Sequence, residues 1–235
     1  MSKFISGLAL SLCFLSLSAE ASLVSEYTFD QGYQDVNGNG PDLVSLGGET
    51  VNGQYLFGDG KGVQLSLPDG DAYAVEIAFN YNAILSYQYG AFMSFGSIKE
   101  NQLYIVDRKL VYYGYGKEFR TGPELFSGED IVFGLSRSVG GEFSYYLNGV
   151  EILTNTDPAG ALSAGGANPL ISFFSDNTAE NISGSIYYIK TYSNEAGLSG
   201  NKSIVDAGGP LMGGAGLLFL MGTTFVSRRE KLLVK

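Results

Sequence analysis

Apolar and polar residues alternate with a period of two along most of this chain, and this pattern limits the possible fold more than any other feature. In 72–79, for example, every second residue from Tyr73 to Phe79 is large and apolar. Successive side chains of a β-strand point to opposite faces, so the pattern predicts strands rather than helices. Glycine, asparagine and aspartate separate the alternating runs, as is typical of turns.

The dipeptide Asn148-Gly149 gives the strongest turn signal, because it joins the alternating runs 143–147 and 150–153 with the residues that tight hairpins prefer. Further strands are predicted at 22–29, 131–135, 169–174 and 185–192, and around Phe92, Phe95, Leu103, Ile105, Val111 and Tyr113. No amphipathic segment before residue 208 is long enough for a helix. About twelve to fourteen short strands with frequent turns predict an all-β antiparallel two-sheet sandwich.

The N-terminal segment 1–21 has the pattern of a signal peptide. A positive start and an apolar core at 4–17 precede Ala19-Glu20-Ala21, which matches an A-x-A cleavage site, so the mature chain is expected to begin at Ser22. The apolar core is too short for a spanning helix. Cys13 follows a leucine rather than the small residue of a lipoprotein signal, and is expected to leave with the peptide.

The C-terminal segment 208–235 has the pattern of a membrane tail. Gly208-Gly209-Pro210 opens an uncharged stretch that runs to Val226, and a basic cluster with Arg228 and Arg229 follows. The stretch is just long enough to cross a bilayer core of ~30 Å, and the basic cluster would stay in the cytoplasm. We therefore predict a transmembrane helix, the alternative being a glycine-rich buried helix. The intervening residues divide into a sandwich domain at 22–193 and a polar linker at 194–207.

This tail resembles the C-terminal sorting tails of Gram-negative bacteria, which combine a short motif, one hydrophobic helix and an Arg-rich end. The resemblance implies a membrane sortase-like enzyme as a partner, transient anchoring in the inner membrane, and a final location at the cell surface or outside the cell. The pair Gly208-Gly209 matches tails of the GlyGly-CTERM (rhombosortase) type. The stretch 205–210 lacks the Pro-Glu-Pro core of the PEP-CTERM (exosortase) type, and the choice between the two types stays open.

The residue types that are missing exclude several kinds of chemistry. The chain has no histidine or tryptophan, and Cys13 is its one cysteine. A disulfide framework, a thiol nucleophile, a Cys-based metal site and a Ser-His-Asp triad are therefore excluded for the mature chain. Between residues 22 and 206, 9 basic and 22 acidic residues give a net charge of −13. This balance disfavours nucleic-acid binding and suits either hard cations such as Ca²⁺ or simple solvation.

The segment 35–40, Asp-Val-Asn-Gly-Asn-Gly, matches the first half of a calcium-binding loop. Asp35, Asn37 and Asn39 place oxygen-bearing side chains at alternate positions, so that the loop could wrap a Ca²⁺ ion. Leu46 stands where a full EF-hand has its glutamate, so only a smaller site, completed by Asp30 or Asp42, is predicted. The alternative is a tight turn, since the same residues favour turns.

Tyrosines occur in close pairs, and the group Tyr112, Tyr113 and Tyr115 is the candidate ligand-binding set. Exposed tyrosine rings on a sheet could stack on sugar rings or form a protein interface. The alternative is that each pair places one ring in the core and leaves its neighbour half-exposed, as alternating strand residues do.

The order of four motifs resembles the laminin G-like, concanavalin A-like jelly-roll domains of secreted bacterial proteins. These motifs are 26–30 (EYTFD) with 35–40, 73–79 (YAVEIAF), 133–137 (FGLSR) with 145–150 (YYLNGV), and 173–177 (FFSDN) with 184–192 (GSIYYIKTY). Ala78 stands where the family usually has tryptophan. The resemblance implies a jelly-roll sandwich, and a second calcium site at Asp176, with Asn177 and Glu180.

Taken together, these features predict an exported, non-catalytic module that binds polysaccharide or a surface protein, with Ca²⁺ as the expected cofactor. One alternative is a carbohydrate-active enzyme. Its E-x-D-x-E strand motif is absent, since Glu76 is followed by Ile77, Ala78 and Phe79, and the histidine of related lyases is absent too. The other alternative is a structural matrix protein that assembles with copies of itself.

Overall fold

The structure is a computed structural model. It describes residues 22–58, 60–82, 84, 88–96, 102–114, 117–119, 122–157, 160, 162–165, 169–175, 182–193 and 198. The predicted signal peptide and C-terminal tail lie outside these residues, as does most of the predicted linker. Within the described residues, no helix is long and apolar enough to cross a membrane.

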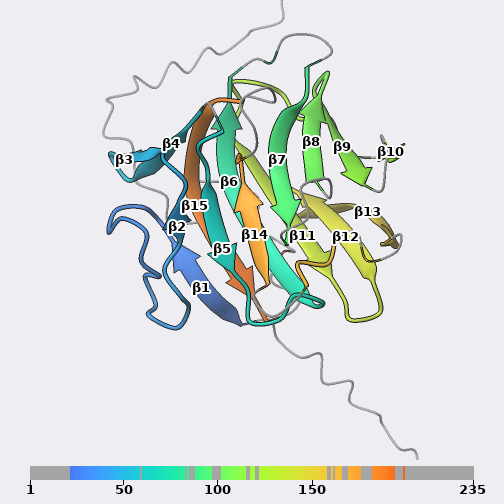
Figure 1. The fold of residues 1–235 in the computed structure, drawn as a ribbon, viewed down its shortest axis with the longest axis horizontal. Helices are drawn as coiled ribbons and strands as arrows, with labels where there is room; N and C mark the ends of the chain where they lie inside the picture. Colours follow the sequence, from blue (N-terminus) through green and yellow to red (C-terminus); the bar gives the residue numbers. More distant parts are fainter. Residues whose placement is uncertain are drawn as a thin grey trace, which may run out of the picture.

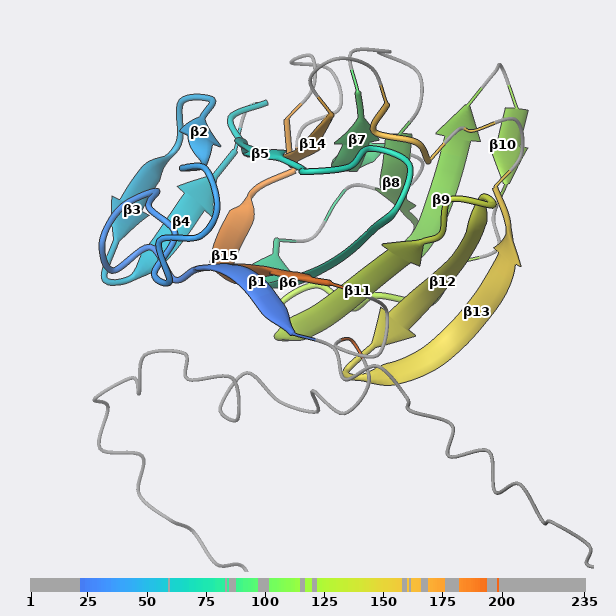
Figure 2. The ribbon, with the colours of Figure 1, turned by 90° about the horizontal axis from the view of Figure 1, so that it is seen from below.

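The described part of the chain forms two antiparallel sheets that stack face to face (Figures 1 and 2). The first sheet contains β13 (Val150–Thr156), β12 (Glu142–Leu147), β11 (Ile131–Arg137), β6 (Tyr73–Tyr81), β15 (Gly184–Tyr192), β4 (Gln54–Phe57) and β3 (Glu49–Val51), in that order, and β1 (Leu23–Tyr27) also pairs with β15. The second contains β10 (Lys117–Phe119), β9 (Lys109–Gly114), β8 (Gln102–Val106), β7 (Gly90–Phe95), β14 (Leu170–Phe173), β5 (Val63–Ser66) and β2 (Val44–Ser45). The prediction of an all-β, two-sheet antiparallel fold is confirmed.

The core lies between the two sheets and is built from the alternating residues of their strands. In β6, the residues Tyr73, Val75, Ile77 and Phe79 all point inward and are at most 8% exposed. Aromatic rings dominate the centre: Phe174 stacks on Phe57 with ring centroids 3.8 Å apart. Burying such rings removes a large apolar area from water, which is the main term that stabilises a sandwich of this kind.

The strands between residues 44 and 66 are not predicted by the sequence analysis. Here β2, β3, β4 and β5 are only two to four residues long and are separated by glycines. Asn52 and Gly53 form a hairpin turn between β3 and β4, with φ values of 51° and 72°. This is the same turn signal as Asn148-Gly149, which does join β12 to β13 with φ values of 51° and 74°.

One end of the first sheet gathers the strand ends that shape the candidate site. The registers pair Arg137 with Tyr73, Tyr192 with Ala74, and Leu23 with Tyr192. The end of β11, the start of β6, the end of β15 and the start of β1 therefore lie next to one another. We call this end of the sandwich the rim.

Leu198 lies on the outer face of the first sheet. It is fully buried there in a small cluster with Ala74 and Tyr146, and Tyr192 packs against the cluster. The sequence analysis assigns this residue to the linker at 194–207. Packing against the sandwich therefore extends at least to Leu198.

Candidate functional site

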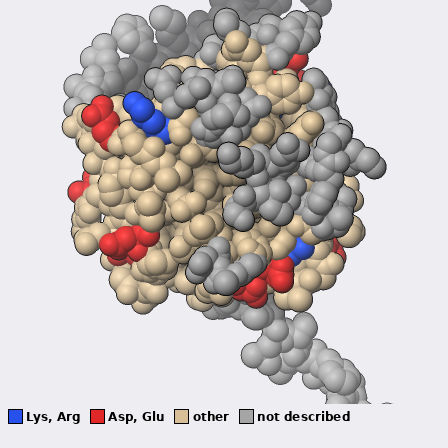
Figure 3. Space-filling model, in the orientation of Figure 1, with Lys and Arg blue, Asp and Glu red and all other residues tan. Residues whose placement is uncertain are grey.

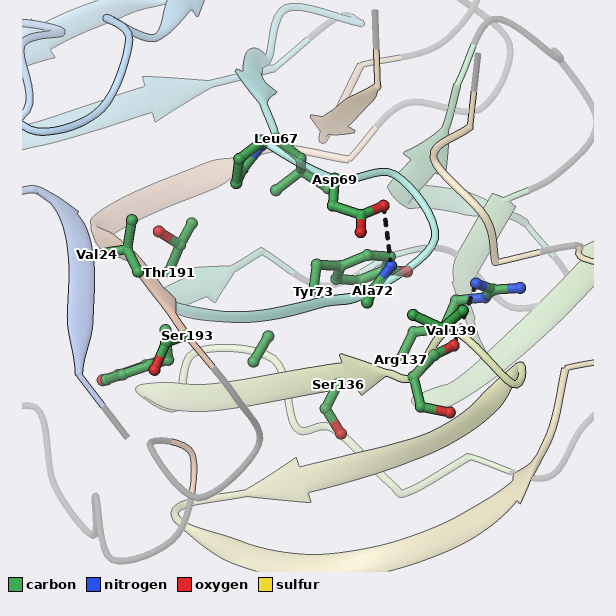
Figure 4. A pocket seen from close by; sticks show the side chains of 14 residues that line it. Val24, Leu67, Asp69, Ala72, Tyr73, Ser136, Arg137, Val139, Thr191 and Ser193 are labelled. Atoms are coloured by element: carbon green, nitrogen blue, oxygen red, sulfur yellow. Dashed lines mark hydrogen bonds between the residues drawn. The ribbon is translucent and has the colours of Figure 1, made fainter. Parts of the chain in front are cut away.

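A groove runs along the rim (Figure 4). Its larger part has a volume of about 550 Å³ and is lined by Val24, 67–69, 72–74, 136–139 and 191–193. A smaller hollow of about 210 Å³ adjoins it, shares Val24, Leu67, Pro68 and Thr191 with it, and is lined in addition by Ser25, 39–41 and Ser66. We call the two hollows together the rim groove. Its lining residues come from strand ends of the first sheet and from the segments that follow β5 and precede β2 of the second sheet.

Arg137, at the end of β11, forms a fixed wall of the rim groove. Its Nε donates a hydrogen bond to Asp157 Oδ2 over 2.7 Å, and this ion pair is buried. Its Nη1 donates to the Asp71 carbonyl oxygen and lies 3.8 Å from the Asp71 carboxylate. The Asp157 carboxylate also accepts from the Leu162 N–H at 3.0 Å. Arg137 thus ties the ends of β11 and β13 to two loops.

Asp69 orders the loop 67–72 that forms the opposite wall. Its Oδ1 accepts a hydrogen bond from the Asp71 N–H at 2.8 Å. It also accepts one from the Ala72 N–H at 3.4 Å (Figure 4). This is the pattern of an Asx turn, in which an aspartate side chain stands in for a backbone acceptor. The loop is therefore held in shape while Asp69 itself stays exposed.

The floor of the rim groove combines hydroxyl groups with apolar surface. Thr191 and Ser25 share a hydrogen bond of 2.7 Å, and the Tyr73 hydroxyl donates to the Leu162 carbonyl oxygen at 2.7 Å. Burial raises the pKa of Tyr73 well above its ordinary value, and the nearby Arg137 charge opposes this rise only in part. Tyr73 therefore stays neutral. At the margin, the Val139 side chain is 76% exposed.

The predicted calcium loop forms one end of this groove. Asp35 Oδ1 accepts from the N–H groups of Glu26, at 2.8 Å, and Asn37, at 3.2 Å, and Oδ2 accepts from those of Asn39 and Gly40, both at 2.7 Å. Burial alone would raise the pKa of Asp35, but these hydrogen bonds to the ionised carboxylate outweigh it and lower the pKa.

This geometry supplies a physical basis for the alternative reading of the loop, a tight turn centred on Asp35. Both Asp35 oxygens already accept two N–H donors each, and Asn39 and Gly40 line the groove beside them. In the described part of the chain, no three acidic residues are grouped so that they could hold a metal. Calcium binding at Asp35, Asn37 and Asn39 stays a prediction. Asp176 and Glu180 lie outside the described residues.

The tyrosines of the candidate ligand-binding set do not share a face. Tyr112 points into the main core and is 7% exposed, whereas Tyr113 lies half-buried on the outer face of the second sheet. Tyr113 there meets Tyr104 edge-on, with ring centroids 6.4 Å apart. Tyr115 lies outside the described residues. A buried Tyr112 ring has no face to offer a sugar, so this set does not form one stacking surface.

A β-bulge changes the expected alternation at Tyr187 and Tyr188. The register of β15 on β6 shifts between Ile186 and Tyr188, and both tyrosines pack on the outer face of the first sheet. Tyr187 donates a hydrogen bond to Asp130 at 2.6 Å. Burial, followed by the hydrogen bond to Asp130, raises the pKa of Tyr187 to about 12. Tyr188 is buried and Tyr187 is half-buried, as expected for such a pair, but both rings lie on the same face because a bulge re-aims side chains.

Several buried charged groups are not predicted as structural features by the sequence. Glu76 is 1% exposed on the outer face of the first sheet and accepts a hydrogen bond from the Tyr188 hydroxyl at 3.0 Å. Lys190 is another, since it is 8% exposed and lies 3.2 Å from the Glu26 carboxylate. The Arg137–Asp157 pair is a further case. The only sequence signal for Arg137 is its place in the motif 133–137, which resembles the laminin G-like pattern.

No protein-family model and no curated protein sequence matches the chain. Solved structures do match. Domain 4 of a GH43 extracellular arabinanase from Geobacillus stearothermophilus, in complex with arabinotriose, aligns with a TM-score of 0.57 and 17% identity over 77% of this chain and 100% of that domain. At this identity the likeness shows the fold alone.

Two further structures have the same fold over part of their length. The binding domain of botulinum neurotoxin DC, in complex with rat synaptotagmin II, aligns with a TM-score of 0.56 and 13% identity over 74% of this chain and 48% of that one. A Trypanosoma rangeli sialidase in complex with sialic acid aligns with a TM-score of 0.56 and 13% identity over 75% of this chain and 32% of that one. This chain therefore spans less than half of either structure.

Proposed function

We propose that this chain is a non-catalytic module, a jelly-roll domain of the laminin G-like class, that binds a segment of polysaccharide in the rim groove. The observation that carries the proposal is the groove itself, a concavity of about 550 Å³ whose floor combines hydroxyl groups with apolar surface and whose walls carry a carboxylate and a guanidinium group. Polysaccharide recognition needs this mixture, because each sugar presents hydroxyl groups at its edge and C–H groups on its faces. The structures of similar fold that hold arabinotriose and sialic acid support the same reading at the level of ligand class.

The engagement of the acidic side chains around the groove supports a binding role rather than a catalytic one. Glycoside hydrolysis needs two carboxyl groups placed on either side of the scissile bond. Asp157 is buried against Arg137 and Asp71 accepts a hydrogen bond from Ser163 at 2.7 Å, so among the described residues around the groove Asp69 has no free carboxyl group to act with as a catalytic pair. The chain also has no histidine to serve as a general base.

Truncating Val139 tests the location of the site. Val139→Ala is expected to weaken binding of a neutral oligosaccharide about threefold to tenfold, because an exposed apolar contact is lost without a change in the core. Val150→Ala is the matched control, since Val150 is also an exposed valine, at 57%, but lies at the other end of the strands. Isothermal titration of wild type and both variants is the measurement. Equal affinity for Val139→Ala and wild type would place the site elsewhere.

We further propose that the chain is exported and cleaved after Ala21. The described contacts support this position, because β1 begins at Leu23 and Ser22 is already bound to the sandwich. The Ser22 N–H donates to Ser193 Oγ at 3.0 Å, and the Ser193 N–H donates to the Ser22 carbonyl oxygen at 2.9 Å. Cleavage there leaves every described strand intact.

Mass spectrometry of the N-terminal peptide, after expression in a Gram-negative host, checks this proposal. The expected result is a mature chain that starts at Ser22. A chain that retains residues 1–21 would contradict export by this route, and a lipid-modified Cys13 would contradict the predicted type of signal peptide. The final location after processing of the C-terminal tail is a proposal that rests on the sequence.

A further inference from the structure

The rim groove carries an excess of negative charge. Arg137 is the one basic residue among the described residues that line it. Its guanidinium group is already paired with buried Asp157 at 2.7 Å and lies 3.8 Å from Asp71. Asp69 adds a third carboxylate, and it is the acidic residue among the described residues that line the groove itself. At this end of the groove one cation therefore stands against three carboxylates, so an anionic ligand would be disfavoured.

The Asp69 carboxylate can accept a further hydrogen bond from a ligand. Only its Oδ1 accepts hydrogen bonds from the described residues, those of Asp71 and Ala72. Figure 4 shows the Asp69 side chain projecting from the loop 67–72 toward Ala72 and Tyr73, two other residues that line the groove. Its second carboxylate oxygen is therefore available to a donor that enters the groove, and an ionised donor makes the strongest hydrogen bond to such an oxygen.

The charge of the whole molecule acts in the same direction. The chain has 24 acidic and 14 basic residues, a net charge of −10. On the face of the molecule in Figure 3, acidic side chains lie around the margin with fewer basic ones, and the described residues between them are uncharged. A surface of one sign raises the local concentration of oppositely charged ligands and lowers that of ligands with the same sign.

Building on the proposed function, we propose that the rim groove prefers glycans with protonated amino groups, such as unacetylated hexosamine units, and disfavours acidic polysaccharides. Asp69 is the residue that accepts the ammonium group. Neutral sugars bind through the hydroxyl groups and the apolar floor. Uronates would place their carboxylates against Asp69 and Asp71.

The test compares three oligosaccharides of equal length on the full-length chain: a glucosamine oligomer, its fully N-acetylated counterpart, and a galacturonate oligomer. At a pH of about 5.5 the amine is protonated and exposed aspartates are ionised. The glucosamine oligomer is expected to bind most tightly and the galacturonate oligomer most weakly. Asp69→Asn is expected to weaken binding of the glucosamine oligomer about threefold to fivefold, as for an exposed ion pair, and to leave the N-acetylated oligomer unchanged.

Two features keep this experiment decisive. In the Asp69→Asn variant, the amide oxygen of the new side chain can still accept from the Asp71 and Ala72 N–H groups, so the loop keeps its shape. Glu129→Gln removes the same unit of charge from an exposed position outside the groove, and is expected to change none of the three affinities. If the N-acetylated oligomer binds but the amine gives no advantage, or if Asp69→Asn and Glu129→Gln act alike, the amine preference is overturned and the proposed function stands. If none of the three binds, both fall.

Discussion

Replacing Arg137 with methionine is expected to lower the free energy of unfolding by about 3–5 kcal/mol, because it leaves the Asp157 carboxylate buried without its partner. Asp157 is 6% exposed, and its side chain is fully buried in the ion pair. Methionine replaces the aliphatic stem of arginine but not its guanidinium group, so the loss reports mainly the missing charge and hydrogen-bond donors rather than lost packing of the stem. Urea unfolding of wild type and variant is the measurement.

A double-mutant cycle separates the ion pair from the rest of the packing. Asp157→Leu alone leaves Arg137 buried beside a hydrocarbon and is expected to cost a similar amount. The double variant Arg137→Met with Asp157→Leu is expected to recover most of the loss, because a buried ion pair can be exchanged for apolar groups at little cost when both partners change. A loss of less than about 1 kcal/mol for Arg137→Met would show that water replaces the lost partner.

The same variant is expected to affect ligand binding, since Arg137 holds Asp71 and the end of β13 in place. Arg137 therefore has a positioning role in the rim groove beside its structural one. The double variant is the useful form for that question, because it is expected to keep the fold while it removes the hydrogen bond to the Asp71 carbonyl oxygen. Its affinity for an oligosaccharide reports how far the loop 67–72 depends on this anchor.

The sequence predicts the strands of this protein better than it predicts the site. Strands with clear alternation, such as β6 and β15, are recognisable because each has one face in the core. The strands β2 to β5 are too short for alternation to show, and only the dipeptide Asn52-Gly53 signals a hairpin there. The local sequence pattern therefore predicts the long strands and misses the short ones.

The rim groove could not be derived from local pattern, because its walls come from distant parts of the chain. Val24, Asp69, Arg137 and Thr191 meet only through the registers of β1, β6, β11 and β15. Asp157, the partner of Arg137, lies 20 residues away along the chain. The positions of the tyrosine rings also depend on details that local pattern does not give. Adjacent strand residues such as Tyr112 and Tyr113 point to opposite faces, unless a bulge intervenes, as one does at Tyr187.

Asp35→Asn is expected to lower the free energy of unfolding by about 2–4 kcal/mol. In a thermal melt this corresponds to a melting temperature that is lower by roughly 5–15 °C. An amide has only one oxygen, so its NH₂ group would face two of the four N–H donors that now reach the carboxylate. Asp42→Asn is the control, because Asp42 is exposed in the same loop. It is expected to change stability by less than about 0.5 kcal/mol.

The pH dependence of stability gives a second test of the Asp35 turn. The folded state lowers the pKa of Asp35 below its ordinary value, so the carboxylate stabilises the fold above a pH of about 4. That contribution is lost as the pH falls through the lowered pKa. The difference in stability between wild type and Asp35→Asn should therefore be full at neutral pH and shrink in acid. A difference that stays constant down to a pH of about 2 would contradict this account.

Calcium distinguishes the two readings of this loop. If the only role of Asp35 is to accept hydrogen bonds from backbone N–H groups, the melting temperatures of wild type and Asp35→Asn should differ by the same amount in excess Ca²⁺ and in EDTA. If the loop holds Ca²⁺, with Asp30 or Asp42 completing the site, the wild type alone should gain stability from the ion. A ligand at about 100 times its dissociation constant adds about 2.7 kcal/mol, which a melt resolves easily. The four N–H contacts favour the first result, since Ca²⁺ would have to compete with donors that already occupy both carboxylate oxygens, and a gain for the wild type alone would confirm the predicted calcium site.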